Sequence, residues 1–178
     1  MSTGSLRINT YLVMALTCLL VWGCQSPETK RKKQLASFRV HMEVNPNAGV
    51  QSKSVPIYRE NPVPINVDKA YFLSEGDVSE TKVMDTVGGI ELSVQLTRQG
   101  RWLLEQYSSA NIGKHMAIFA QFGEKLRKNR WLAAPKITHR ITDGLLIFTP
   151  DATREEADEI ALGLNNVAKQ VQEKAPGW

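Results

Sequence analysis

Cysteine and histidine are scarce in this 178-residue chain, which contains two cysteines and three histidines. Two cysteines cannot build a disulfide framework, and three histidines are too few for a histidine-rich metal site. No cysteine follows Cys24, so thiol catalysis and cysteine-based metal binding are excluded from the folded part. We therefore expect no metal ion and no other cofactor there.

The chain also has little that resembles a membrane-spanning helix. The apolar run Tyr11–Trp22 carries no charge for twelve residues, whereas a spanning helix needs about 20. Hydrophobic residues make up 42% and charged residues 22%, which is the balance of a globular protein and excludes disordered, collagen-like and polytopic membrane chains. The length fits one domain.

The net charge of +4 lies outside the body, in the signal and the tether. Lys30–Lys33 are four consecutive basic residues, whereas residues 35–178 hold 17 basic and 17 acidic residues. Because the body is electrically neutral, we expect no nucleic-acid partner. The basic tether, residues 24–36, can lie against anionic lipid headgroups or form a solvated linker, and both interpretations stay open.

The amino-terminal segment has the layout of a secretory signal, with a positive start, an apolar stretch and a small residue before a polar turn. Val21-Trp-Gly-Cys24 resembles the lipobox of bacterial lipoproteins, which implies removal of residues 1–23 and acylation of Cys24. The alternative is an uncleaved anchor over residues 6–23. Both place the body outside the cytoplasm, held at a membrane. By resemblance to lipoprotein sorting, Gln25 favours the outer membrane if the cell is Gram-negative.

The body, residues 37–174, alternates strand and helix signals. Gly88-Gly89 joins residues 81–87 to residues 90–96, in which apolar and polar side chains alternate, as in a β-hairpin. Thr97 is a helix cap, and Thr153 with Glu156 is a capping box before a helix of about 20 residues. Further predicted elements are strands at 38–44, 63–73 and 115–122, a helix at 98–110, a charged hairpin at 123–130, and a hairpin pairing 137–141 with 145–148 across Asp143-Gly144. Residues 50–64, which contain three prolines, are expected to form either an irregular extended segment or an edge strand. Together they predict an α+β fold of two layers, a mostly antiparallel sheet with two main helices on one face.

No pattern in the chain points to catalysis. His41, His115 and His139 each stand alone in a strand pattern, and no nucleophile, base and orienting group converge on one motif. Asn111-Ile-Gly-Lys114 follows a predicted helix instead of preceding one, so it indicates a helix end and not a phosphate loop. We expect that the protein is not an enzyme.

The candidate contact surface is a basic hairpin beside one aromatic residue. Its members are Lys125, Arg127, Lys128, Arg130 and Trp131. A basic loop with an amphipathic aromatic suits an anionic membrane surface, an acidic partner or peptidoglycan. The alternative, which we prefer, is a solvated hairpin tip whose charges keep a sheet edge soluble.

The order of features from residue 63 to 170 resembles the head subdomain of the first periplasmic domain of SecD, a subunit of the SecDF preprotein translocase accessory complex. The motifs are Phe72-Leu-Ser-Glu-Gly-Asp77, Leu96-Thr-Arg-Gln-Gly100, Asn111–Lys114, Ala134-Pro-Lys-Ile137, Ile141-Thr-Asp-Gly144 and the stretch from Phe148 to Ala157.

The resemblance implies an α+β module that binds unfolded polypeptide or another envelope protein and is related to protein export. The resemblance does not imply a proton-driven transport cycle for this chain, because in that family the membrane helices conduct the protons. We therefore expect an envelope lipoprotein with a non-catalytic binding domain. The alternatives are a structural scaffold in an envelope complex and, last, an unrecognised hydrolase.

Overall fold

The computed structural model describes residues 31, 33–47 and 49–174, and the folded unit begins at Lys33. The predicted signal, residues 1–23, and Cys24 lie outside the described residues, as does most of the tether. None of the helices in the described part is both long enough and apolar enough to cross a membrane.

The strands form two antiparallel sheets. The first has five strands in the order β2-β3-β1-β6-β7. The second has three in the order β4-β5-β8. The bounds are β1 Ser37–Glu43, β2 Ser52–Ile57, β3 Val63–Ser74, β4 Val78–Thr86, β5 Gly89–Leu96, β6 Met116–Phe122, β7 Lys128–Ala133 and β8 Leu145–Phe148, with short 3₁₀ turns η1 Gly49–Gln51, η2 Glu75–Asp77 and η3 Glu124–Leu126.

Two helices complete the body, α3 (Arg98–Ala110) and α4 (Arg154–Lys174). The hydroxyl of Thr97 accepts from the Gly100 amide at 3.2 Å, so the predicted cap is confirmed. The capping box is confirmed as well, because the Glu156 amide donates to Thr153 Oγ1 and the Thr153 amide donates to the Glu156 carboxylate.

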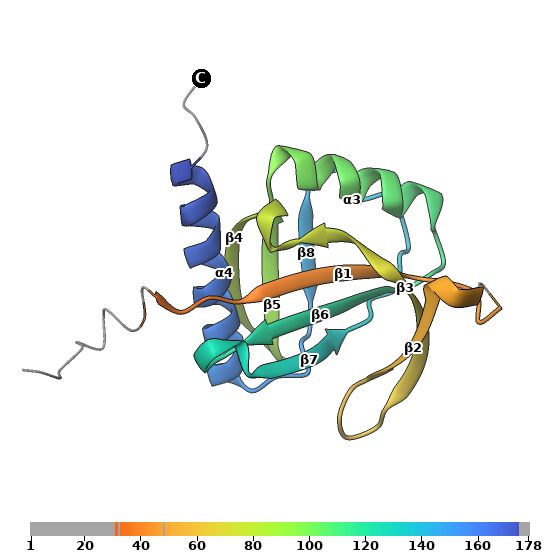
Figure 1. Cartoon of the computed structure of the whole chain (residues 1–178), viewed down its shortest axis with the longest axis horizontal. Helices are drawn as coiled ribbons and strands as arrows, with labels where there is room; N and C mark the ends of the chain where they lie inside the picture. Colours follow the sequence, from red (N-terminus) through yellow and green to blue (C-terminus); the bar gives the residue numbers. More distant parts are fainter. Residues whose placement is uncertain (1–30, 32, 48, 175–178) are drawn as a thin grey trace, which may run out of the picture. The chain divides into compact units, whose positions relative to one another are not determined.

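The main core lies between the two sheets and is closed by the helices. In Figure 1 the strands of the smaller sheet cross behind β1, β6 and β7, with α3 along one side and α4 along another. Fully buried side chains from both sheets and from both helices meet in this core, among them Phe38, Leu73, Leu92, Leu104, Ile118, Phe122, Leu132, Ile160 and Leu164.

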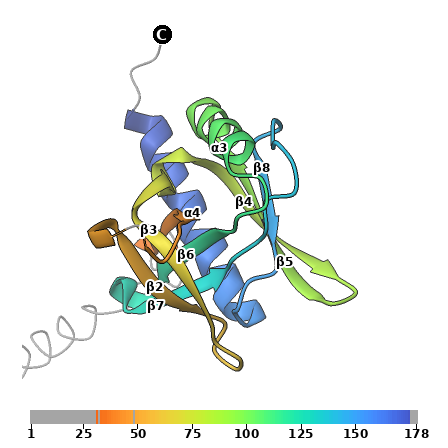
Figure 2. The ribbon, with the colours of Figure 1, turned by 90° about the vertical axis from the view of Figure 1, so that its right-hand side faces the viewer.

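The five-stranded sheet is strongly curled, because its two edge strands, β2 and β7, contact each other. Figure 2 shows these two strands side by side. Their approach makes the sheet face that points away from the main core concave. A second, smaller cluster of buried side chains lies on that face, formed by Val55, Ile57, Val67 and Ala117.

The segment that leads from the tether into β1 packs directly on α4. Gly163 lies so close to Leu35 and Ala36 that a Cβ there would sit 2.6 Å from the Ala36 nitrogen. The Asn166 side-chain amide also donates to the Gln34 carbonyl at 2.8 Å. Residues 34–36 are therefore held on the helix by both close packing and a hydrogen bond.

The predicted α+β class with mostly antiparallel strands is confirmed, with the difference that the strands divide into two sheets. The Gly88-Gly89 hairpin is confirmed as β4–β5. The predicted hairpin of 137–141 with 145–148 is wrong, because β8 pairs with β5 and the preceding segment is bonded elsewhere. The backbone of Ile137 is hydrogen-bonded to the residues that follow α3. The Ile141 amide donates to Ser108 Oγ on that helix.

Candidate functional site

The concave face of the five-stranded sheet is the candidate site. Side chains alternate between the two faces of a strand. On β1, β6 and β7, the residues that alternate with the core residues therefore point to the concave side. In the described part of the chain no helix covers this face, and it contains a hollow of about 320 Å³. The hollow is lined by Arg39, His41, Lys53, Val67, Asp68, Lys69, Phe119, Gln121 and Trp131.

Aromatic rings form the floor of the hollow. The ring of Trp131 on β7 lies 5.1 Å from that of Phe119 on β6, its cross-strand neighbour, and 5.3 Å from that of His41 on β1. The Tyr71 ring on β3 meets His41 edge-on at 6.1 Å. Trp131 and Phe119 are half-buried, so part of each side chain remains available to apolar side chains of a partner.

His41 is hydrogen-bonded within this floor. Its Nδ1 lies 2.8 Å from the Asp68 carbonyl oxygen, which can only accept, so Nδ1 is the donor in this contact. Burial lowers the pKa of His41 below its usual value, and the hydrogen bond to Asp68 only partly opposes that effect. The lowered pKa favours the uncharged form of the ring.

The rim of the hollow is mainly cationic. Arg39, Lys53 and Lys69 line it together with one carboxylate, Asp68. The Arg39 guanidinium also lies over the Tyr71 ring, 5.0 Å from its centre, in a cation–π contact. Aromatic floor and cationic rim together suit a chain segment that carries both apolar and acidic side chains.

The predicted basic hairpin is divided between the two faces of the sheet. Arg130 pairs in register with Ala120, and Lys128 with Phe122, so both cations point toward α4. Trp131 points to the opposite, concave face and lines the hollow. Of the five predicted contact residues, the structure therefore brings one into the candidate site.

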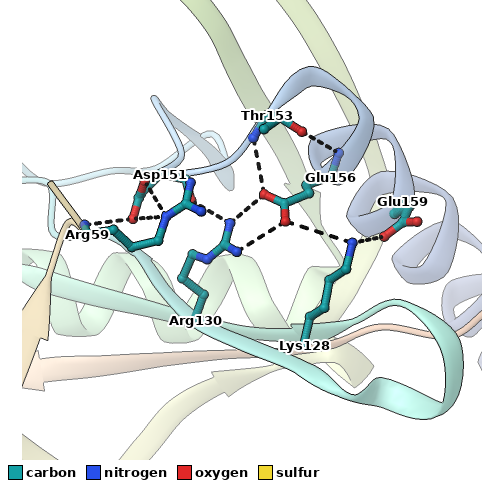
Figure 3. A network of polar contacts seen from close by, with 7 residues as sticks. All are labelled: Arg59, Lys128, Arg130, Asp151, Thr153, Glu156 and Glu159. Atoms are coloured by element: carbon teal, nitrogen blue, oxygen red, sulfur yellow. Dashed lines mark hydrogen bonds and ion pairs between the residues drawn. The ribbon is translucent and has the colours of Figure 1, made fainter.

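Lys128 and Arg130 take part in an ion network with α4 (Figure 3). Arg130 makes two hydrogen bonds to the Glu156 carboxylate, at 2.5 and 3.1 Å, and a third to the Asp151 carbonyl. The Lys128 ammonium lies 3.3 Å from Glu159. The hydrogen bonds from Arg130 hold the pKa of Glu156 below its usual value, against the opposing effect of burial. This network fastens β7 to α4.

Lys125 and Arg127 remain exposed at the tip between β6 and β7. Lys125 and Leu126 both have positive φ, at 54° and 56°, which is the pattern of a type I′ hairpin turn. Residues with side chains adopt this conformation at a cost of about 1–2 kcal/mol each. The turn projects the Lys125 side chain from the end of the sheet, apart from the network on α4.

Sequence reasoning missed most of the site. Arg39 and Phe119 could be assigned to one face of their strands from the alternation, but not to an open face. The histidines were expected to stand alone, yet His115 Nδ1 lies 2.7 Å from the Glu43 carboxylate. Burial raises the pKa of Glu43, but the hydrogen bonds from His115 outweigh it and leave this pKa lowered. No group of three or more His, Cys, Asp or Glu residues suited to a metal occurs among the described residues.

Comparisons with known proteins agree on one fold. The model of the family "SecDF, P1 head subdomain" matches residues 52–168. A structure described as "Structure and function of a membrane component SecDF that enhances protein export" is 20% identical with a TM-score of 0.55, covering 82% of this chain and 71% of that chain. "Crystal structure of SecDF in Super-membrane-facing form" is 19% identical with a TM-score of 0.52, covering 79% of this chain and 21% of that one. No curated protein sequence matches this chain.

Proposed function

This chain belongs to the family of SecDF P1 head subdomains, and from that membership we propose that it is a non-catalytic, polypeptide-binding module of the cell envelope, related to protein export. The solved relative is a membrane component that enhances protein export. The observation that carries the proposal is the concave sheet face, with its aromatic floor and cationic rim. Such a face can accept the apolar and acidic side chains of an extended segment.

The first test removes the aromatic centre of the hollow. Trp131→Ala is expected to weaken binding of a permanently unfolded protein, reduced and alkylated, by about tenfold, because buried aromatic anchors carry most of the energy of an interface. Trp102→Ala is the matched control, since Trp102 lies on α3, is 57% exposed and does not line the hollow. Fluorescence anisotropy of the labelled polypeptide gives both dissociation constants.

Equal binding by the two tryptophan variants and the wild type would contradict the assignment of the hollow. Circular dichroism of Trp131→Ala shows whether the variant is folded, because Trp131 also packs against the smaller cluster. Arg39→Ala provides a second variant, since its side chain is at the rim and not in the core. Capture of one stoichiometric partner in place of many unfolded chains would favour the scaffold alternative.

The exposed tip forms a second proposed contact, for an anionic partner or surface. Lys125 and Arg127 carry it, because Lys128 and Arg130 are engaged with α4. The double variant Lys125→Glu/Arg127→Glu is expected to bind anionic liposomes more weakly than the wild type in a sedimentation assay. Unchanged binding would leave the tip as the solvated hairpin end that the sequence also allows.

We also propose that the module is held at a membrane through acylated Cys24 and faces the periplasm or the exterior. The support is the lipobox-like Val21-Trp-Gly-Cys24 and the family of the folded part. An uncleaved anchor over residues 6–23 is the alternative. In either case the basic tether, residues 24–36, joins the anchor to the body.

A further inference from the structure

Strand β8 is the free edge of the three-stranded sheet. It pairs with β5 on one side and with no other described strand on its other side. Its four residues, Leu145-Leu-Ile-Phe148, carry no charge and no proline. Leu146 and Phe148 point into the main core, while the Ile147 side chain is 44% exposed.

The register shows which backbone groups of β8 face outward. Leu96 donates its amide to the Gly144 carbonyl, so in this antiparallel pair the hydrogen-bonded positions continue at Leu146 and Phe148. The N–H and C=O groups of Leu145 and Ile147 therefore point away from β5. The Leu145 amide donates to Asp143 Oδ1. No hydrogen bond within the described residues uses the Leu145 carbonyl or either backbone group of Ile147.

The other three sheet edges are each protected. Strand β2 contains Lys53 and Pro56, and it contacts β7. Strand β7 carries Lys128 and Arg130, which are bonded to α4. On β4 the side chain of Asn165, from α4, accepts a hydrogen bond from the Thr81 amide at 2.7 Å and donates one to the Thr81 carbonyl at 2.8 Å, as a neighbouring strand would.

Natural proteins protect exposed edges with charges, prolines or covering elements, because an open edge is a template for a further strand. Among the described strands, β8 is the edge that carries no charge and no proline and pairs with no second strand, so that its short length of four residues is the protection it has. Its outward backbone groups are therefore open to one further short strand.

We propose that the β8 edge binds an extended segment of a polypeptide as a fourth strand of the β4-β5-β8 sheet. This inference rests on the proposed polypeptide-binding function and adds a second contact to it, separate from the hollow. The Ile147 amide donates to the backbone of the segment and the Ile147 carbonyl accepts from it, which aligns the segment, and the exposed Ile147 side chain favours an apolar residue opposite it.

The size of the edge favours a polypeptide over a second copy of this chain. Four residues form an edge about 14 Å long. A stable dimer buries on the order of 1,200 Å² or more, which a strand of this length cannot supply by itself. A weak contact along an extended chain suits the edge, because several such contacts on one polypeptide add to its overall affinity.

Hydrogen exchange at single residues of the whole chain, followed by NMR, tests the proposal. The probe is a short peptide of alternating threonine and valine, and its control is the same peptide N-methylated at every residue, which has no N–H donor on either edge. The Ile147 amide is expected to exchange at least about tenfold more slowly with the unmodified peptide and to be unchanged by the N-methylated one. The Leu146 and Phe148 amides, already bonded to β5, serve as internal references.

Two substitutions separate the edge from other exposed apolar positions. Ile147→Lys is expected to weaken binding of the unmodified peptide by about tenfold, because a charge on an edge opposes strand addition. Val87→Lys is the control, since Val87 is fully exposed at the β4–β5 turn, away from the edge.

If the peptide shifts the Trp131 resonances while Ile147 exchange stays unchanged, the edge proposal is wrong and the hollow stands. If the Ile147 amide exchanges more slowly at higher protein concentration in the absence of peptide, the edge binds a second copy of this chain, and the proposal is again wrong. If neither site responds to the peptide or to an unfolded protein, both the edge and the proposed function fail.

Discussion

Arg130 shows how the position of a residue in its strand decides its role. A lysine or arginine in a basic loop is expected to be solvated, yet Arg130 and Glu156 have side chains only 16% and 14% exposed. Strand alternation points Arg130 to the α4 side, and the adjacent Trp131 to the hollow. Of these two adjacent residues on β7, Arg130 therefore stabilises the fold, whereas Trp131 is available to a partner.

Removal of the Arg130 side-chain charge is expected to destabilise the protein. Arg130→Met leaves the largely buried Glu156 carboxylate without its main partner, which costs about 2–3 kcal/mol in the free energy of unfolding. Arg127→Met is the matched control, because Arg127 is exposed at the tip, and its effect should stay within about 0.5 kcal/mol. Urea denaturation at pH 7 measures both, and equal effects of the two variants would refute the structural role of Arg130.

The same pair predicts how stability depends on pH. The pKa of Glu156 in the folded state is lowered, chiefly by the hydrogen bonds from Arg130, relative to its usual value near 4.5. A carboxyl group of this kind stabilises the fold above its unfolded pKa, and the contribution is lost as pH falls through the folded pKa. Between pH 7 and 3, the wild type should lose more free energy of unfolding than Arg130→Met. A parallel pH dependence for the two proteins would show that Arg130 does not set this titration.

At the scale of elements, α4 joins parts of the chain that are far apart in sequence. It caps the β4 edge through Asn165, fastens β7 through Glu156 and Glu159, and holds residues 34–36 through Asn166. The point at which the tether reaches the body is thus fixed on this helix.

Gly163 is the residue of α4 that permits the close approach of the tether segment. Gly163→Ala places a Cβ within 2.7 Å of Leu35 and Ala36 backbone atoms, so the segment has to move away. We expect a loss of about 1–3 kcal/mol and faster tryptic cleavage after Lys33. Gly88→Ala is the control, because a Cβ at Gly88 meets nothing within 4 Å. Unchanged cleavage in Gly163→Ala would mean that the segment is held by other contacts.

The incorrect hairpin at 137–148 is also explained at this scale. The chain does bend at Asp143, Gly144 has a φ of 71°, and β8 follows as expected. The segment before this bend is hydrogen-bonded to α3 and to the residues that follow α3, because Ser108 Oγ and the backbone of Lys114 supply partners. Local sequence predicts where the chain bends, but not which neighbour the preceding segment pairs with.

At the scale of the whole molecule, charge divides the chain into a basic tether and a neutral body. Residues 24–34 carry a net charge of +3, whereas residues 35–178 are balanced. The cationic rim of the hollow is therefore a local arrangement within a neutral domain. If the rim binds acidic segments as proposed, that binding should weaken at high ionic strength, because salt screens the charges involved.

Lipidation of Cys24 is the prediction that concerns the whole chain. Mass spectrometry of the purified protein should show Cys24 as the first residue, with acyl chains, and Cys24→Ser should abolish the modification. A membrane-bound protein that still begins with Met1 would support the uncleaved anchor instead. Intact protein found free in the cytosol would contradict both.

The sequence by itself determined the local features of this protein: the capped helices, the glycine hairpin, the proline-containing edge strand and the segregation of positive charge. These depend on residues close together in the chain, whose periodicity and hydrogen-bonding groups act locally. Only the tertiary structure decided that the strands form two sheets, that Arg130 faces α4 while Trp131 faces the hollow, and that β8 has an open edge. Those outcomes depend on which distant segment covers each face and edge, and packing between distant segments leaves no local pattern in the sequence.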